Sequence, residues 1–135
     1  MKFMMLVYTD PALIDALPEG DFDSKMRYCL GHADDLRRKG QLLDSQMLQP
    51  APTARSMRVR NGRTSIVDGP FAEAKEFLAG FNLIEAENID EAMEMAAEFP
   101  WARTGCIEVR PVLEIDSMRK RVGAAAHIEE RDSVP

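Results

Sequence analysis

The chain has 135 residues, of which 45% are hydrophobic and 30% charged, and its formal net charge is -6. This size and composition predict one soluble domain with its own core, and the acidic balance argues against nucleic acid or an anionic membrane as a partner. The two cysteines are too few for a disulfide framework, and no apolar stretch reaches the ~18 residues that a membrane span needs. We therefore expect a cytoplasmic protein.

The first half of the chain predicts a strand, a helix and a second strand. Residues 3–8 form an apolar run that ends at Asp10 and Pro11, as a buried strand does, and not a signal peptide. Residues 11–20 are predicted to be a loop. A helix follows, with Asp21 or Asp23 as its cap and Gly40 just after its end. Its apolar stripe has helical spacing and contains Phe22, Met26, Leu30, Ala33 and Leu36. Residues 41–48 predict the second strand.

A hairpin is predicted over residues 55–68, because Asn61-Gly62 is the sequence that favours a two-residue hairpin turn. That turn sets the register and places Met57 opposite Ile66 and Arg55 opposite Asp68. The segment also holds the main basic cluster, which we interpret as a solvated face. The cluster consists of Arg55, Arg58, Arg60 and Arg63.

The second half predicts a strand within 75–87, a helix and a last strand over 106–115. Asn88 is expected to cap the helix, with Glu91 completing a capping box. The predicted buried stripe of this helix contains Ile89, Ala92, Met93 and Ala96. Pro111 lacks an N–H, so the last strand is expected at an edge of the sheet. We expect one domain over residues 1–115, followed by a polar tail over 116–135 that forms a short helix or frays.

The order of elements favours an α+β fold, namely a ferredoxin-like split βαβ sheet with an inserted β-hairpin. Two helices can cover only one face of such a sheet. The other face would leave apolar residues exposed, and a second copy of the chain is the simplest partner to cover it. We therefore predict a homodimer with two sheets face to face, in the manner of a dimeric α+β barrel.

Three stretches, MKFMMLVY, DGPFAEAKE and IEVRPV, resemble the DGPF family, which is part of the YCII-related group of the dimeric α+β barrel superfamily. The resemblance covers residues 1 to about 115. It implies a ferredoxin-like protomer and a dimer, in a family that is mostly uncharacterised. Some relatives are associated with extracytoplasmic-function sigma factors. In the wider group, a histidine on the first helix and the aspartate of a D-P-F segment have been proposed as an acid–base pair. The aspartate corresponds to Asp68, whereas the histidine position falls on Cys29, one turn before His32.

Asp68 and His32 are the candidate catalytic residues. Asp68 would act as a general base or a substrate anchor, with a pKa raised by partial burial; alternatively, it caps the turn before Gly69-Pro70 or pairs with Arg55. His32 could shuttle a proton or lie at the helix boundary without a role.

Arg55 and Phe71 are candidate substrate-binding residues, although Phe71 could instead fill the gap between the hairpin and the next strand. Cys29 and Cys106 are interpreted as small buried residues, since nothing beside them in the sequence would lower a thiol pKa. His32 and His127 have no neighbouring ligand cluster, so no metal site is expected. No cofactor-binding motif is present, and no cofactor is expected.

Two functional hypotheses follow. The first is a small-molecule-binding protein or cofactor-free enzyme with Asp68 near a cleft. The second is a non-catalytic dimeric module that binds another protein, with a sigma factor as the candidate suggested by the resemblance. An enclosed pocket reached by Asp68 would favour the first hypothesis, and an Asp68 buried against Arg55 would favour the second.

Overall fold

A four-stranded antiparallel sheet organises the chain, and the computed structural model describes residues 1–71 and 74–125. The strands are β1 (Lys2–Thr9), β2 (Leu42–Met47), β5 (Phe77–Glu85) and β6 (Gly105–Pro111), in the order β2-β5-β1-β6. This order is that of the ferredoxin-like split βαβ fold, so the predicted α+β class is confirmed. Within the described residues the sheet stays open and forms no closed barrel.

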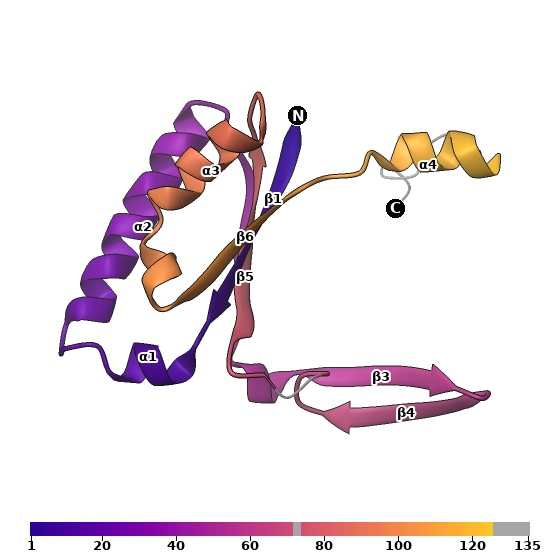
Figure 1. The fold of residues 1–135 in the computed structure, drawn as a ribbon, viewed down its shortest axis with the longest axis horizontal. Coiled ribbons are helices and arrows are strands. Elements are labelled where there is room, and N and C mark those ends of the chain that lie inside the picture. The colour runs from indigo at the N-terminus through magenta and orange to yellow at the C-terminus, as the bar shows by residue number, and fades with distance from the viewer. Residues whose placement is uncertain (72–73, 126–135) are drawn as a thin grey trace, which may run out of the picture.

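Helices α2 (Asp21–Arg38) and α3 (Ile89–Ala97) pack on the same face of the sheet (Figure 1). Side chains alternate between the faces of a strand, and Phe3, Met5 and Val7 of β1 are buried toward these helices. Ala33 and Leu36 of α2 and Ala92 and Ala96 of α3 complete this side of the core. The short turn η2 (Pro100–Arg103) closes the core with Trp101.

The hairpin forms a separate two-stranded sheet of β3 (Arg55–Arg60) and β4 (Arg63–Asp68). Its register is the predicted one, with Arg55 opposite Asp68 and Met57 opposite Ile66. Asn61 and Gly62 form the turn with φ values of 52° and 74°, the left-handed conformation that this turn type requires. A short turn, η1 (Ala51–Thr53), leads into the hairpin.

Three predictions of where elements begin and end are wrong. Residues 11–20 are not all loop, because α1 (Pro11–Asp15) starts there: the Asp10 side chain accepts a hydrogen bond from the Ala12 N–H at 3.0 Å. Helix α2 is capped by Gly20, not by Asp21 or Asp23, which lie in its first turn. The last strand ends at Pro111, and Ile115 begins a helix, α4 (Ile115–Val122).

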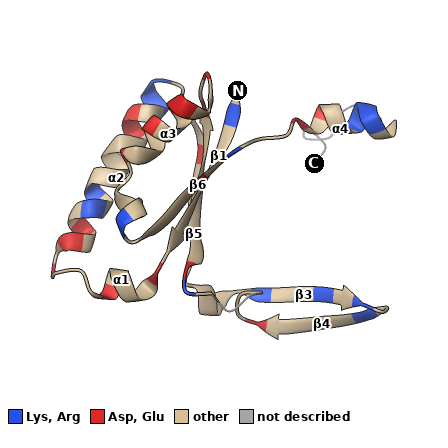
Figure 2. Ribbon diagram, viewed as in Figure 1, with Lys and Arg blue, Asp and Glu red and all other residues tan. Residues whose placement is uncertain are grey.

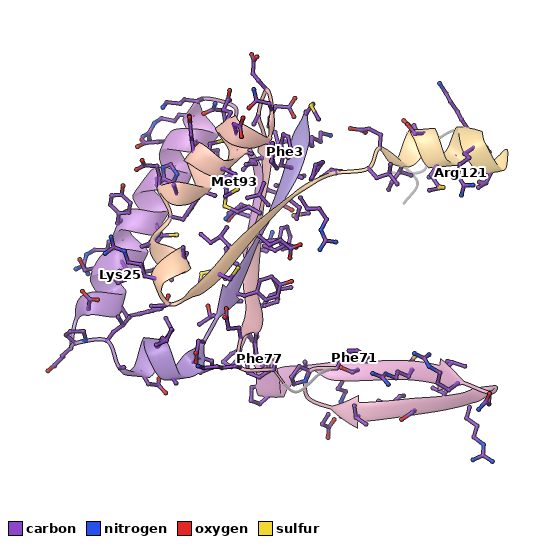
Figure 3. All side chains as sticks on the ribbon, viewed as in Figure 1. Phe3, Lys25, Phe71, Phe77, Met93 and Arg121 are labelled. Atoms are coloured by element: carbon purple, nitrogen blue, oxygen red, sulfur yellow. The ribbon has the colours of Figure 1, made fainter. Side chains whose placement is uncertain are left out.

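Helix α3 begins as predicted, since the Asn88 side chain accepts a hydrogen bond from the Glu91 N–H at 2.9 Å. Its buried face is rotated relative to the prediction. Met95 is buried, whereas Met93, labelled on α3 in Figure 3, is 48% exposed. Phe99, just beyond the end of the helix, is buried in the same cluster as Met95 and Ala96.

The face of the sheet opposite α2 and α3, which we call the open face, carries apolar side chains. They alternate with the buried residues of the central strands and comprise Met4, Leu6 and Tyr8 of β1 and Phe81 and Leu83 of β5. The hairpin and α4 both project on this side of the sheet (Figure 1). Lys and Arg gather on these two projections (Figure 2). Residues 55–68 hold four arginines and one aspartate, a net charge of +3, which leaves -9 for the rest of the chain.

Candidate functional site

A cavity of about 240 Å³ lies between α2 and the helix-covered face of the sheet. The apolar stripe of α2 divides over it: Ala33 and Leu36 are buried in the core, while Phe22 and Leu30 remain 38% and 53% exposed and line the cavity. The exposed Leu30, together with Met47 and Leu48 at the end of β2, places the opening between α2 and β2. Four of the five residues of a stripe that helical periodicity assigns to the core, all but Leu36, thus line a hollow.

Asn82 is the main polar group of the cavity, and it is only 7% exposed. It lies on β5 and faces the helices, between the buried Gly80 and Ile84. Its Oδ1 accepts a hydrogen bond from the Ser45 hydroxyl of β2 at 2.6 Å, and its Nδ2 donates to the thioether sulfur of Met5 at 3.6 Å. Two neighbouring strands therefore hold a buried amide at the floor of an apolar cavity.

Cys29 and Trp101 form the wall nearest η2. The indole Nε1 of Trp101 donates a hydrogen bond to Sγ of Cys29 at 3.3 Å, and the Trp101 ring lies 5.7 Å from the ring of Phe22, centroid to centroid. Burial raises the pKa of the Cys29 thiol, and the indole N–H offsets only part of that shift. Because a nucleophilic cysteine needs a lowered pKa, Cys29 is a neutral thiol that lines the cavity.

Asp68 and Arg55 lie at the base of the hairpin and are not cavity residues. Nε of Arg55 and Oδ1 of Asp68 are 3.2 Å apart, and their side chains are 79% and 84% exposed. The aspartate is thus paired as the register predicts, but in solvent and not in a cleft. The turn after it is held by the backbone, since the Gly69 N–H donates to the Ala54 carbonyl at 2.6 Å.

Phe71 does not fill a gap between the hairpin and β5, because it is 60% exposed. It lies where the hairpin meets the rest of the chain (Figure 3), and the Arg58 guanidinium covers its ring at 3.7 Å from the centroid. The preceding residue, Pro70, lines a second apolar hollow beside η1. Of the DGPF residues, Pro70 is therefore the one that reaches a hollow, and Asp68 and Phe71 lie outside both hollows.

His32 joins the two helices. Its Nε2 lies 3.1 Å from the Met95 carbonyl of α3, to which it donates as the Nε2–H tautomer, and its ring packs edge-on against Phe99 at 4.5 Å. It lies on the outer side of α2, beside Tyr28 and Glu98. The structure therefore places His32 and Asp68 in different parts of the fold and does not bring them together as a pair.

The described residues contain neither a cluster of metal ligands nor a membrane-spanning helix. No three His, Cys, Asp or Glu side chains in residues 1–71 and 74–125 gather closely enough to hold a metal ion. None of the helices in that same part of the chain is long and apolar enough to cross a membrane. His127, which the sequence analysis considered as a ligand, lies outside the described residues.

Sequence reasoning missed Asn82, although a signal was present. The strand FNLIE contains one polar residue whose alternation places it on the buried face, with Ile84 two residues later. A buried amide in a strand indicates a polar partner nearby, here Ser45. The partner could not be identified because strand pairing between β2 and β5 is not encoded locally.

Two comparisons with known proteins bear on this chain. A family model described as the YCII-related domain matches residues 1–116. A protein of Rhizobium meliloti (strain 1021), described as uncharacterized, is 34% identical over 114 residues, which cover 83% of this chain and 92% of that protein. The similarity thus extends through β6 and includes every element that lines the cavity.

Proposed function

This chain belongs to the YCII-related domain family, and on that premise we propose that it binds a small apolar molecule in the cavity between α2 and the sheet. The observation that carries the proposal is the lining. It combines apolar and aromatic walls with a few fixed polar groups, and the described residues that form it include no Asp, Glu, Lys, Arg or His, which is the usual character of a small-molecule site. A well-packed core would have no such hollow.

The geometry favours binding over catalysis by the two residues that the sequence suggested. Asp68 is exposed and paired with Arg55, and His32 is held by the Met95 carbonyl. Neither lines the cavity. A cofactor-free reaction there would have to use its neutral groups, such as the Asn82 amide and the Cys29 thiol.

The experiment is a calorimetric titration of the full chain with ethylbenzene. Ala33 is 9% exposed and lines the cavity, so Ala33→Leu is expected to occupy the space and abolish binding. Gly31→Leu is the matched control, because it adds the same side chain to the same helix where nothing lies within 4 Å of an added Cβ. If the wild-type chain binds no neutral aromatic probe of this size, or if Ala33→Leu binds ethylbenzene as well as Gly31→Leu does, the proposal is wrong.

The proposal includes a homodimer formed through the open face. Met4, Leu6, Tyr8, Phe81 and Leu83 supply the apolar surface, and the hairpin extends beyond the sheet on the same side (Figure 1). The hairpin carries +3 in a chain of net charge -6, so charge complementarity favours a second copy as the occupant. The expected mass in solution is twice 15.2 kDa. We also expect a reducing, cytoplasmic location, in keeping with the free thiols of Cys29 and Cys106.

A non-catalytic module that binds another protein, such as an extracytoplasmic-function sigma factor, is the second candidate. The exposed hairpin favours it, since Met57, Ile66 and Val67 are each more than half exposed, and large exposed apolar side chains on a protein surface mark partner sites. This candidate predicts that ethylbenzene does not bind and that the hairpin stays accessible in the dimer.

A further inference from the structure

We propose that the ligand of the cavity is an uncharged molecule of about ten non-hydrogen atoms with one hydrogen-bond acceptor, which Nδ2 of Asn82 binds. An aromatic ketone has this chemistry. This inference rests on the proposed binding function and adds the chemical class of the ligand. It draws on the charge of the lining, the hydrogen bonds of Asn82, the aromatic wall and the size of the cavity.

The lining excludes ions. None of the cavity residues within 1–71 and 74–125 carries a charge, and transferring an ionised carboxylate from water to a site without a counter-charge costs many kcal/mol. Ser45, Asn82 and the Cys29 thiol are neutral groups, and all three already form a hydrogen bond: Ser45 and Asn82 with each other, and Cys29 with Trp101. A carboxylate or phosphate ligand would therefore meet no compensating cation among the described residues of the lining.

Asn82 has donor capacity to spare. Its Nδ2 carries two N–H groups, and among the described residues the structure gives it one acceptor, the Met5 sulfur at 3.6 Å. A thioether is a weak acceptor. The orientation of the amide is fixed by the Ser45 hydroxyl, which donates to Oδ1 at 2.6 Å. Asn82 is only 7% exposed, so water has little access to its second N–H group. A hydrogen-bond acceptor on the ligand would satisfy that N–H.

The walls and the volume fix the rest of the ligand. Phe22 and Trp101 present tilted rings 5.7 Å apart, and aromatic rings pack well against such a wall. An engineered cavity of about 150 Å³ holds benzene. A cavity of about 240 Å³ therefore accommodates a ring with a substituent of two or three heavy atoms. Met26 and Met47 lie at its edge, and their unbranched side chains can adjust to the ligand.

The experiment compares three probes of similar size on the full chain by calorimetry at neutral pH. Acetophenone has the ring and the acceptor, ethylbenzene has the ring alone, and benzoate has a charge. Acetophenone is expected to bind about tenfold more tightly than ethylbenzene, since one hydrogen bond contributes on that order, and benzoate is expected not to bind. In Asn82→Leu the two neutral probes are expected to bind equally. Gln49→Leu, which removes an exposed amide outside the lining, is the control and keeps the preference.

The outcomes separate the two proposals. If ethylbenzene and acetophenone bind wild type equally, or if benzoate binds best, the ligand class is wrong while the binding function stands. If no neutral probe binds, the binding function itself fails. Because the comparison of probes on the wild-type chain is decisive alone, the inference stays testable even if Asn82→Leu does not fold.

Discussion

Replacing the hairpin, residues 55–68, with two glycines tests how the second copy is held. The ends can be joined, because the Gly69 N–H already bonds to the Ala54 carbonyl at 2.6 Å. No residue of β3 or β4 is buried, so the four-stranded sheet loses no core contact. We expect the free energy of unfolding of the monomer to change by less than about 1 kcal/mol, as for surface changes generally.

The dimer is expected to weaken much more. Met57, Val59 and Ile66 share one face of the hairpin and are 65%, 53% and 59% exposed. Full burial of such a side chain contributes ~1.5–3 kcal/mol, so covering the exposed part contributes about 1 kcal/mol each. Two hairpins in a symmetric dimer then contribute up to about 6 kcal/mol, less the cost of ordering them. The expected loss in dimer affinity is about a hundredfold or more.

Sedimentation of the shortened and full chains over a range of concentrations measures this loss, and thermal unfolding checks the fold. Ile66→Lys is the matching point variant, with Val67→Lys on the opposite face of β4 as its control. If the shortened chain dimerises as tightly as the full chain, the hairpin plays no part in the assembly. If the monomeric shortened chain is not folded, the inference that the exposed hairpin makes no contribution to the core is wrong.

Three further predictions concern single residues. Gly105→Ala is expected to destabilise the chain by about 3 kcal/mol or more, because an added Cβ would lie 1.9 Å from the Tyr8 carbonyl oxygen. Gly31→Ala, at an exposed position of α2, is instead expected to raise the free energy of unfolding by ~0.5–1 kcal/mol. Urea unfolding of both variants checks this pair. Asn88→Ala is expected to cost about 1 kcal/mol, since it removes the acceptor for the Glu91 N–H; an unchanged urea midpoint would contradict it. Burial raises the pKa of the Cys29 thiol, so the folded state favours the neutral form. The resulting contribution to stability is present below the unfolded pKa of about 8.5 and is lost as pH rises above it. Urea midpoints measured from pH 7 to 10 are therefore expected to fall more steeply for wild type than for Cys29→Ala.

Local sequence signals predicted the elements that local chemistry controls. Asn61-Gly62 fixes a turn by its backbone conformation, and every pair of the hairpin follows from it. Asn88 and Gly40 mark helix ends for the same kind of reason. α1 was missed because Pro11 reads as a loop residue, whereas Pro at a first helical position is favourable once Asp10 caps the helix.

The candidate site was harder to predict because it is assembled from distant segments. Asn82 meets Ser45 across 37 positions and Met5 across 77, and neither pairing has a local signal. Periodicity also treats every member of the α2 stripe alike. Only the packing shows that Ala33 is buried while Leu30 stays half exposed, although both line the hollow. The position of Asp68 depended on whether the hairpin folds back on the sheet, and in this structure it projects away (Figure 1).

Trp101 is the single tryptophan of the chain, and it stands in the cavity wall with its N–H on the Cys29 sulfur. All tryptophan fluorescence of the protein therefore comes from this one position. The emission wavelength depends on the polarity around the ring. The wild-type protein therefore reports, without a dye or label, whether water or a bound ligand occupies the space beside Trp101.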